Sequence, residues 1–346
     1  MIGWFSEIGL ADRPTVGGKG GSLGELTKAG IAVPPGFVVR TGAFDAFIAA
    51  LEREAPVRAA IEALAADAEL DTLTRACAAI RARIERSSLP DDVREEIAAA
   101  YARLTGDAIV PVAVRSSATT EDAEDASFAG LQDTYLWVTS LEQVLAKLRS
   151  CWASLYSVES VGYRRRRNVP EAGVSMAVVV QRMVDARTAG VMFTRSPTTG
   201  DRSVITIEGA WGLGSAVVGG EVTPDRWVIG KITGDITVRD ISDKHVRHRP
   251  AAGGGIVDEA VPAAQRTAAC LSDEQLQALR VVGRRVEKHY GRPQDIEWAV
   301  DEASGDILLL QSRPETVWSS KESAPVARAA SDPLSHVMSI FGGRKS

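Results

Sequence analysis

The sequence changes character at Gly106, and this change constrains the fold more than any other feature. From 42 to 104 it is rich in Ala, Leu, Glu and Arg at helical spacing, with interruptions near Pro56 and Pro90, which predicts three or four helices. After Gly106, Val, Ile, Thr and Gly dominate, and strands are expected at 111–115, 134–138, 174–182, 189–194, 203–208, 226–230 and 235–240. The mixture indicates an α/β (α+β) protein.

Turn signals and helix caps define the remaining elements. Ser272 and Gln275 have the spacing of a capping box at a helix start. The other expected elements are a glycine-rich turn followed by a helix at about 22–29, a strand at 37–39, a long helix at about 141–165, a flexible connection at 249–264, a helix at 272–290 and a hairpin at 294–313.

Length and composition exclude several classes of protein. At 346 residues the chain has room for two or three structural units. Its 40 basic and 45 acidic residues give a net charge of -5, which provides no general basic field for nucleic acid or an anionic membrane. The three cysteines form no C-x-x-C pair, the four histidines have no zinc-hydrolase spacing, and the first residues lack the pattern of a signal peptide. We therefore expect a cytoplasmic protein in which any phosphate chemistry uses local positive charge.

A glycine-rich segment surrounds Lys19. In VGGKGGSLGEL, four glycines flank the lysine at the entry to a predicted helix. Backbone amides, a helix N-terminus and a lysine together suit a phosphate group, although the Walker A pattern is not met. A glycine-rich turn with a solvated lysine is about as good an interpretation from these residues alone.

A second segment places Arg115 at the end of a predicted strand, before a run of hydroxyl side chains. A guanidinium beside hydroxyl groups suits bidentate binding of phosphate oxygens. A surface loop in which Arg115 pairs with the acids between 121 and 125 is slightly favoured by composition alone. A further glycine-rich stretch at 208–225 is as typical of a packing turn as of a ligand loop.

The predicted terminal hairpin carries four polar residues on one face. If its turn centres on Ser304, Glu297 lies opposite Gln311 and Asp295 lies opposite Arg313. Two oxygen ligands would then meet beside the guanidinium of Arg313, and such oxygens suit Mg²⁺. The alternative is an ordinary edge hairpin with one exposed salt bridge, but the apolar run at 307–310 favours inward-facing polar residues.

Taken in order, several segments resemble the N-terminal nucleotide-binding domain of the phosphoenolpyruvate synthase and pyruvate phosphate dikinase family, which is of the ATP-grasp class. The resemblance covers 15–316. The matching stretches are GGKGGSLGEL, VPPGFVV, VAVRSSATTEDAEDASFAGLQDTYL, VVVQRMV, GVMFT, AWGLGSAVVGGEVTPD, EKHYGRPQDIEWA and LLLQSRPET.

This resemblance implies ATP and Mg²⁺ as cofactors, and it implies roles for individual residues. Lys19 and Arg115 would hold the ATP phosphates, and Arg313 would stabilise the transferring phosphoryl group. The metal would be carried by Glu297 and Gln311. The remaining nucleotide contacts would be the adenine-binding hinge at Gln181, Met183 and Val184, and Gly130 and Thr134 near the phosphates or ribose.

In that family ATP is cleaved to AMP, a histidine on a swivelling domain receives the β-phosphoryl group, and phosphate or a phosphorylated acceptor takes the γ-phosphoryl group. The histidine motif G-G-x-[TS]-[SC]-H-x-A is absent from this sequence, because the pair at Ser335 and His336 lacks the glycines and the alanine. The resemblance therefore implies a partner subunit that carries the histidine and the acceptor site. The acceptor would be phenol, as in phenylphosphate synthase, or pyruvate.

The implied organisation is two ATP-grasp subdomains with the nucleotide cleft between them. The first would span 1–184, with the helical insert at about 42–104, the second 185–316, and a tail 317–346. A non-catalytic nucleotide-sensing module is the alternative function, but such a module would not need metal ligands or Arg313.

Overall fold

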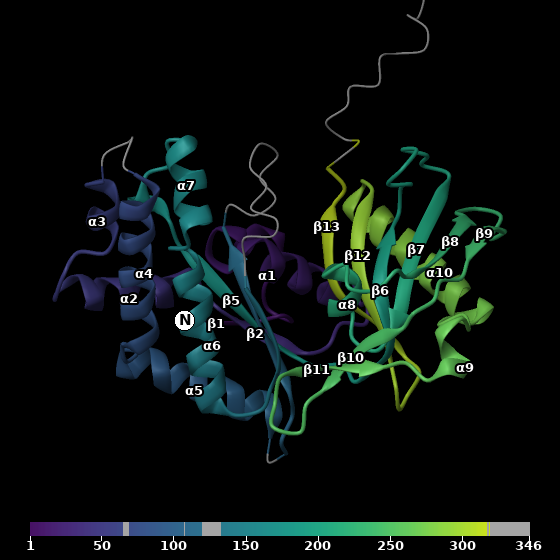
Figure 1. Ribbon diagram of the computed structural model, residues 1–346, viewed down its shortest axis with the longest axis horizontal. Coiled ribbons are helices and arrows are strands. Elements are labelled where there is room, and N and C mark those ends of the chain that lie inside the picture. Colours follow the sequence, from purple (N-terminus) through teal and green to yellow (C-terminus); the bar gives the residue numbers. More distant parts are fainter. Residues whose placement is uncertain (65–68, 107, 120–132, 317, 319–346) are drawn as a thin grey trace, which may run out of the picture. The chain divides into compact units, whose positions relative to one another are not determined.

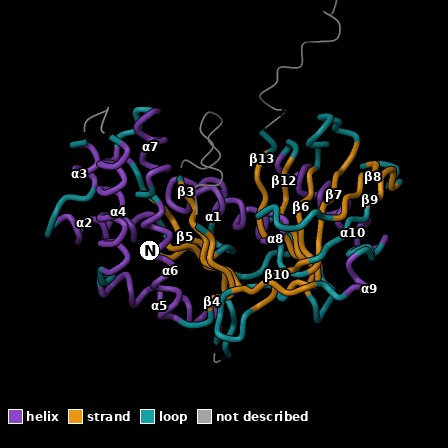
Figure 2. Tube along the Cα trace, viewed as in Figure 1, coloured by secondary structure: helices purple, strands orange, loops and turns teal. Residues whose placement is uncertain are grey.

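A computed structural model describes residues 1–64, 69–106, 108–119, 133–316 and 318 of the chain. Met1–Glu315 form one compact unit, and Thr316–Ser346 form a second unit. The elements named below lie in the first unit, and the α/β class expected from the sequence is confirmed by its two large sheets and their helices (Figures 1 and 2).

Four helices occupy the described part of 41–105, as the composition predicts. They are α2 (Thr41–Glu52), α3 (Arg58–Glu62), α4 (Leu70–Arg86) and α5 (Asp91–Thr105). Pro90 precedes the first residue of α5, where a missing N–H is tolerated. Phe44 and Phe47 of α2 pack on Trp152 of α6 (Leu141–Ser154), with ring centroids 5.8 and 5.1 Å apart. This aromatic contact belongs to a large apolar core that also includes strands of the first sheet.

The first sheet has five strands in the order β1-β2-β5-β3-β4, and each neighbouring pair is antiparallel. The strands are β1 (Ile2–Trp4), β2 (Gly36–Val39), β5 (Met176–Arg182), β3 (Val112–Ala118) and β4 (Thr134–Val138). The sequence analysis missed β1, because three residues are too few for an alternating pattern to stand out. Strand β3 is buried along its whole length, which explains its continuous apolar start.

The second sheet has six strands in the order β13-β12-β6-β7-β8-β9, also antiparallel throughout. They are β13 (Ile307–Pro314), β12 (Gln294–Asp301), β6 (Ala186–Phe193), β7 (Val204–Trp211), β8 (Asp225–Gly230) and β9 (Ile236–Asp240). Helix α10 (Asp273–Tyr290) begins at the expected capping box, in which Ser272 accepts from the Gln275 backbone N–H. Its apolar side joins a core built around Trp227 and Trp298.

The segment around Lys19 is helical, which corrects the expected turn before residue 22. Helix α1 runs over Arg13–Lys28 and is interrupted only at Gly17, where φ is +72°. A Cβ atom at Gly17 would lie 2.2 Å from the Ser117 carbonyl oxygen on β3. The glycine is therefore needed for a close approach between α1 and β3 as well as for its backbone conformation.

Two further expectations are wrong in detail. The long helix at 141–165 is two helices, α6 and α7 (Val158–Arg166), because the Ser157 side chain caps the second by accepting from the Ser160 N–H. The expected flexible connection at 249–264 contains an antiparallel hairpin of β10 (Val246–Pro250) and β11 (Ile256–Ala260), followed by α9 (Ala263–Arg266). The short elements α8 (Ser215–Val218), η1 (Leu10–Asp12) and η2 (Glu171–Gly173) complete the described unit.

The expected division of the domain after residue 184 falls between β5 of the first sheet and β6 of the second. The chain before that point also contributes to the core around Trp227 and Trp298, since Leu26 and Ile31 pack there. The subdomain boundaries, and the tail expected from residue 317, remain predictions. Among the described residues, no helix combines the length and the apolar character needed to cross a bilayer.

Candidate functional site

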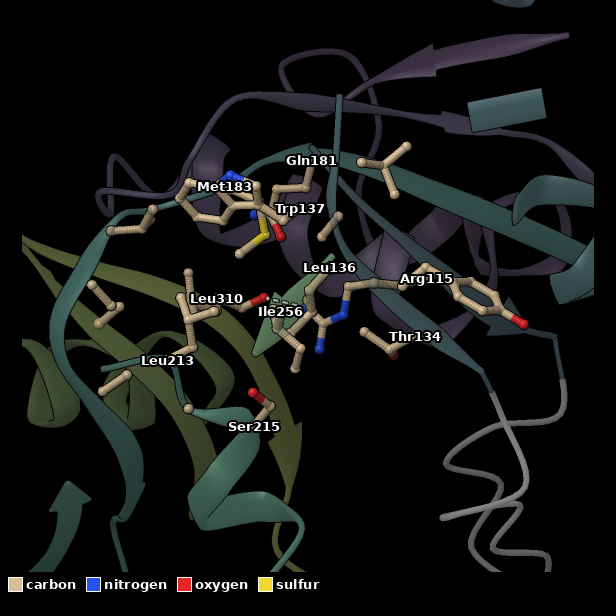
Figure 3. A pocket seen from close by; sticks show the side chains of 18 of the residues that line it. Arg115, Thr134, Leu136, Trp137, Gln181, Met183, Leu213, Ser215, Ile256 and Leu310 are labelled. Atoms are coloured by element: carbon tan, nitrogen blue, oxygen red, sulfur yellow. Dashed lines mark hydrogen bonds between the residues drawn. The ribbon is translucent and has the colours of Figure 1, made fainter. Parts of the chain in front are cut away.

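A cavity of about 940 Å³ is lined by residues of both sheets (Figure 3). The first sheet supplies β3, β4 and the end of β5, and the second supplies β6, β12 and β13. The loop after β7, the turn between β10 and β11, and helix α6 also contribute lining residues. Six of the residues that the sequence analysis selected line this cavity, namely Arg115, Thr134, Gln181, Met183, Val184 and Glu297.

One part of the cavity wall is apolar. Met183, Trp137, Ile256 and Leu310 pack on a small buried cluster that includes Val184 and Leu213. Figure 3 shows these side chains around the cavity, with Met183 beside the end of β5. Gln181 is buried, and its amide donates to the Pro34 carbonyl at 3.3 Å. A flat apolar group with polar edges would fit such a surface.

Trp137 is a lining residue that the sequence analysis missed. Its φ of +56° is rare for a bulky side chain. Its carbonyl oxygen accepts a hydrogen bond from the Gly255 N–H at 3.0 Å, which joins β4 to the β10–β11 turn. Left-handed backbone is typical of Gly and Asn, so no sequence signal pointed to Trp137.

Arg115 occupies the polar part of the cavity wall and links the two sheets. It lies on β3 opposite Thr134 of β4, and it is only 8% exposed. One guanidinium nitrogen, Nη2, donates to Glu297 Oε2 at 3.0 Å and to Gln311 Oε1 at 2.5 Å. The other, Nη1, donates to the Leu310 carbonyl at 3.0 Å. Arg115 is therefore a buried strand residue and not an exposed loop arginine; the acids at 121–125, with which the alternative pairs it, lie outside the described residues.

The terminal hairpin has the register that its turn position predicts. Glu297 is paired with Gln311, and Asp295 is paired with Arg313. A register shift follows Glu297, so that Trp298 faces Leu309. The guanidinium that contacts Glu297 and Gln311 is that of Arg115, whereas Arg313 Nε lies 3.5 Å from Asp295 Oδ2. The sequence alone predicts the Arg313 guanidinium beside Glu297 and Gln311, and the structure places Arg115 there instead.

Asp295 is the titratable group of the hairpin whose environment is most unusual. Burial raises the pKa of its carboxyl to about 6, and Arg313 offsets only part of this effect. The negative charge of Glu315 raises the pKa of Asp295 further. The ion pair between Asp295 and Arg313 is therefore sensitive to pH in the mildly acidic range.

Lys19 lies on α1, outside the residues that line the cavity. The next residue, Gly20, donates its N–H to Ser117 Oγ at 3.1 Å, so this part of α1 lies against the end of β3. Burial raises the pKa of the Cys151 thiol on α6, and the positive charge of Lys19 offsets part of this effect. Gly130 is outside the described residues. The assigned roles of Lys19 and Gly130 remain predictions.

Lys147 is a second lining residue that the sequence analysis missed. It lies on α6, and its ammonium group is 4.5 Å from the centre of the Tyr135 ring. The Tyr135 hydroxyl donates to Asp133 at 2.8 Å. Lys147 thus adds positive charge to the part of the cavity wall that carries Arg115. Because lysines are common on the exposed face of an amphipathic helix, its sequence position did not indicate a place in the cavity.

The glycine-rich loop after β7 packs closely on the β10–β11 hairpin and also lines the cavity, and its role as a ligand loop stays a prediction. At Gly212, φ is +77° and a Cβ would lie 2.5 Å from the His248 carbonyl oxygen, so this glycine permits close packing. Gly214, Ser215 and Gly219 line the cavity. The loop therefore connects the β10–β11 hairpin to the cavity wall.

The oxygen atoms of Glu297 and Gln311 fit the requirements of a magnesium ion. Both lie within hydrogen-bond distance of the same nitrogen of Arg115, so they converge on one cationic group. A carboxylate and an amide oxygen are hard donors, and Mg²⁺ is usually held by few protein oxygens with phosphate oxygens and water. The donor set present is therefore suitable for the metal that accompanies a nucleotide phosphate chain.

Comparison with known proteins identifies the class to which this fold and cavity belong. The sequence matches the family described as pyruvate phosphate dikinase, AMP/ATP-binding domain, over residues 13–332. The chain belongs to this family. Membership confirms the family resemblance expected from the sequence, and the two-sheet architecture confirms the α/β class.

Among curated relatives, the chain is similar to three proteins named as phosphoenolpyruvate synthases, two of them as probable ones. A protein of Methanothermobacter thermautotrophicus is 43% identical over 91% of this chain and 46% of its own length. One from Pyrococcus furiosus is 37% identical over 94% of this chain and 45% of its length. One from Methanocaldococcus jannaschii is 39% identical over 91% of this chain and 27% of its own length. The chain thus spans less than half the length of these relatives.

Proposed function

We propose that this chain binds MgATP in the cavity between its two sheets and cleaves it to AMP, with the β-phosphoryl group passing to a histidine outside these residues and the γ-phosphoryl group to water or inorganic phosphate. The observation that carries the proposal is the contact of Arg115 with both Glu297 and Gln311. It gathers a cation and two hard oxygen donors at the wall of a cavity that is otherwise largely apolar. Family membership supports the choice of an adenine nucleotide as the ligand.

The apolar wall suits the adenine ring. Met183 and Val184 follow β5, and Trp137 and Leu310 supply further apolar surface. Backbone groups of the segment after β5 would provide the polar contacts to the ring edge, as is usual in ligand cavities. Thr134, opposite Arg115 on the neighbouring strand, would contact the ribose or the phosphates.

The polar wall suits the phosphate chain. Glu297 and Gln311 would hold Mg²⁺, which would neutralise phosphate charge in a low-dielectric site. Arg115 and Lys19 would bind phosphate oxygens, and Arg313 would stabilise the charge that moves during phosphoryl transfer. Arg313 is 47% exposed along its side chain, so it is accessible to a group that enters from outside the domain.

The proposed transfer requires a nucleophilic histidine, and no histidine in the described part of the chain lines the cavity. No histidine of the 346 residues stands in the carrier motif. His248 and His289, which are described, are engaged with carboxylates. We infer that the carrier histidine lies on another part of a longer protein or on a partner subunit.

The names of the relatives favour pyruvate over phenol as the final acceptor. Product analysis with ATP labelled at the β-phosphorus tests the proposal. With the histidine-bearing polypeptide of the same source added, we expect AMP, acid-labile label on that polypeptide, and its discharge by pyruvate. Discharge by phenol would identify the other acceptor. ADP as the nucleotide product, or rapid acid-labile labelling of this chain alone, would contradict the proposed transfer, and ATP binding without any cleavage would indicate a sensing module.

A further inference from the structure

A cluster of three metal-binding side chains lies behind the glycine-rich loop. His248 of β10 lies opposite Asp258 of β11 in the hairpin register, and Glu221 approaches from the end of the loop that follows β7. One donor atom from each side chain lies within 4.8 Å of the others. None of the three belongs to the cavity lining, so the cluster is distinct from the oxygen pair of Glu297 and Gln311.

The distances in the cluster match those around a tetrahedral ion. His248 Nε2 lies 3.0 Å from Glu221 Oε2 and 3.3 Å from Asp258 Oδ1. Ligands about 2.0 Å from a tetrahedral zinc ion are separated from one another by about 3.3 Å. The two distances from His248 fit this spacing, and the two carboxylate oxygens lie within 4.8 Å of each other.

The other nitrogen of His248 is already fixed. Nδ1 lies 2.7 Å from Ser215 Oγ, and the His248 side chain is 5% exposed. If Nδ1 donates its proton to Ser215, Nε2 presents its lone pair towards the two carboxylates. A second hydrogen bond of this kind commonly orients metal-binding histidines.

The charge of the cluster also favours a cation. Two carboxylates face a single ring nitrogen, and the flanking arginines of β10 pair elsewhere, Arg247 with Glu259 and Arg249 with Asp185 and Glu302. Both carboxylate side chains are at least half exposed, which gives an ion access from solvent. One imidazole and two carboxylates suit zinc or a similar divalent transition metal better than magnesium, because Mg²⁺ prefers oxygen ligands alone.

We propose that His248, Glu221 and Asp258 bind one divalent transition-metal ion of the zinc type. The ion would join the loop that contains Ser215 to the β10–β11 hairpin. Both segments contribute residues to the cavity, Ser215 from the loop and Ile256 from the hairpin. Metal binding would therefore stabilise one wall of the cavity without touching the nucleotide phosphates.

Calorimetric titration of the chelator-treated protein with Zn²⁺, in excess Mg²⁺ to occupy oxygen sites, tests this proposal. We expect one equivalent to bind, and Glu221→Gln and Asp258→Asn to weaken binding by about tenfold or more. Both substitutions are at exposed positions and retain the side-chain shape, so the fold should be kept. His248→Gln should remove the site.

His289→Gln provides the matched control. His289 also pairs with a carboxylate, Glu25, at 2.7 Å, but the described residues place no third metal-binding side chain beside this pair. This variant should bind Zn²⁺ as the wild type does, and Co²⁺ should give the visible absorption of a nitrogen- and oxygen-ligated ion in both proteins. Absence of stoichiometric Zn²⁺ binding, or unchanged affinity in both carboxylate variants, would overturn the proposal. Neither result would bear on ATP cleavage, which is assayed separately.

Discussion

Arg115 on β3 donates a hydrogen bond to Glu297 on β12, 182 residues later in the chain, at 3.0 Å. This contact joins the two sheets at the wall of the cavity. Arg115 is almost completely buried and the Glu297 side chain is 32% exposed, so solvent screens the pair only in part. The relationship places a cation and a carboxylate where a nucleotide phosphate chain and its metal would lie.

Substitution of Glu297 by Gln should reduce the Mg²⁺ dependence of ATP binding. The substitution keeps an oxygen for Arg115 but removes the charge that attracts a divalent ion. We expect MgATP affinity to fall by about tenfold or more, equivalent to ~1.4 kcal/mol. Calorimetry with and without Mg²⁺ measures this effect.

Asp306→Asn is the control for that experiment, because Asp306 is exposed in the turn of the same hairpin. It should leave MgATP affinity unchanged. Equal affinity of the wild type for ATP with and without Mg²⁺ would remove the metal role from Glu297.

Arg313→Ala should lower kcat by roughly 10²-fold, with a smaller change in KM, because a donor to the moving phosphoryl group acts mainly in the transition state. Arg313→Lys should restore little activity, since lysine lacks the planar pair of donors. Steady-state kinetics with the histidine-bearing polypeptide measures both variants. The exposed Arg239→Lys on β9 should behave as the wild type. A change in KM alone would assign Arg313 to ground-state binding.

Asp295 should make folding stability depend on pH between about 4 and 6. Its pKa is raised from 3.8 to about 6 in the folded state, so the folded protein binds more protons than the unfolded chain in this range. The contribution of the neutral Asp295 carboxyl to folding stability is fully present below the pKa of the unfolded chain, and it is lost as pH rises through the pKa of the folded protein. As pH rises over this interval, the free energy of unfolding of the wild type should fall by about 2–3 kcal/mol relative to that of Asp295→Asn. Urea denaturation of both proteins at several pH values measures the difference, and parallel pH profiles would contradict the assignment.

Gly17→Ala should destabilise the fold by about 2 kcal/mol or more, because the new Cβ would clash with the Ser117 carbonyl and φ is positive. Gly42→Ala in α2 is the matched control, since a Cβ there meets nothing within 4 Å. That change should be neutral or stabilising by up to about 1 kcal/mol. Thermal or chemical denaturation compares them. Similar stability of the two variants would show that α1 and β3 are not closely packed at Gly17.

Local patterns predicted most elements and the hairpin register. The turn position at Ser304 and a side-chain period of two were sufficient to pair Glu297 with Gln311 and Asp295 with Arg313. Both patterns are local, so they can be recognised without knowledge of the tertiary fold.

Features that depend on distant segments were not predictable in this way. The contact of Arg115 with Glu297 requires two sheets to be brought together, and Trp137 adopts its backbone conformation where the Gly255 N–H reaches its carbonyl. The glycines at 253–255 indicated flexibility, although cross-strand pairing makes the segment a hairpin. At Lys19, the glycines that suggested a loop instead allow a helix to pack closely on β3.

Photolabelling with 8-azido-ATP can show whether the cavity between the two sheets is the nucleotide site. Peptide mapping should find the label in segments of the apolar wall, at 134–138, 181–190, 213–219 or 253–256. Unmodified MgATP should prevent that labelling. Label that is confined to helices α2 to α5 and is prevented by MgATP would place the nucleotide outside the cavity and would contradict the proposed site.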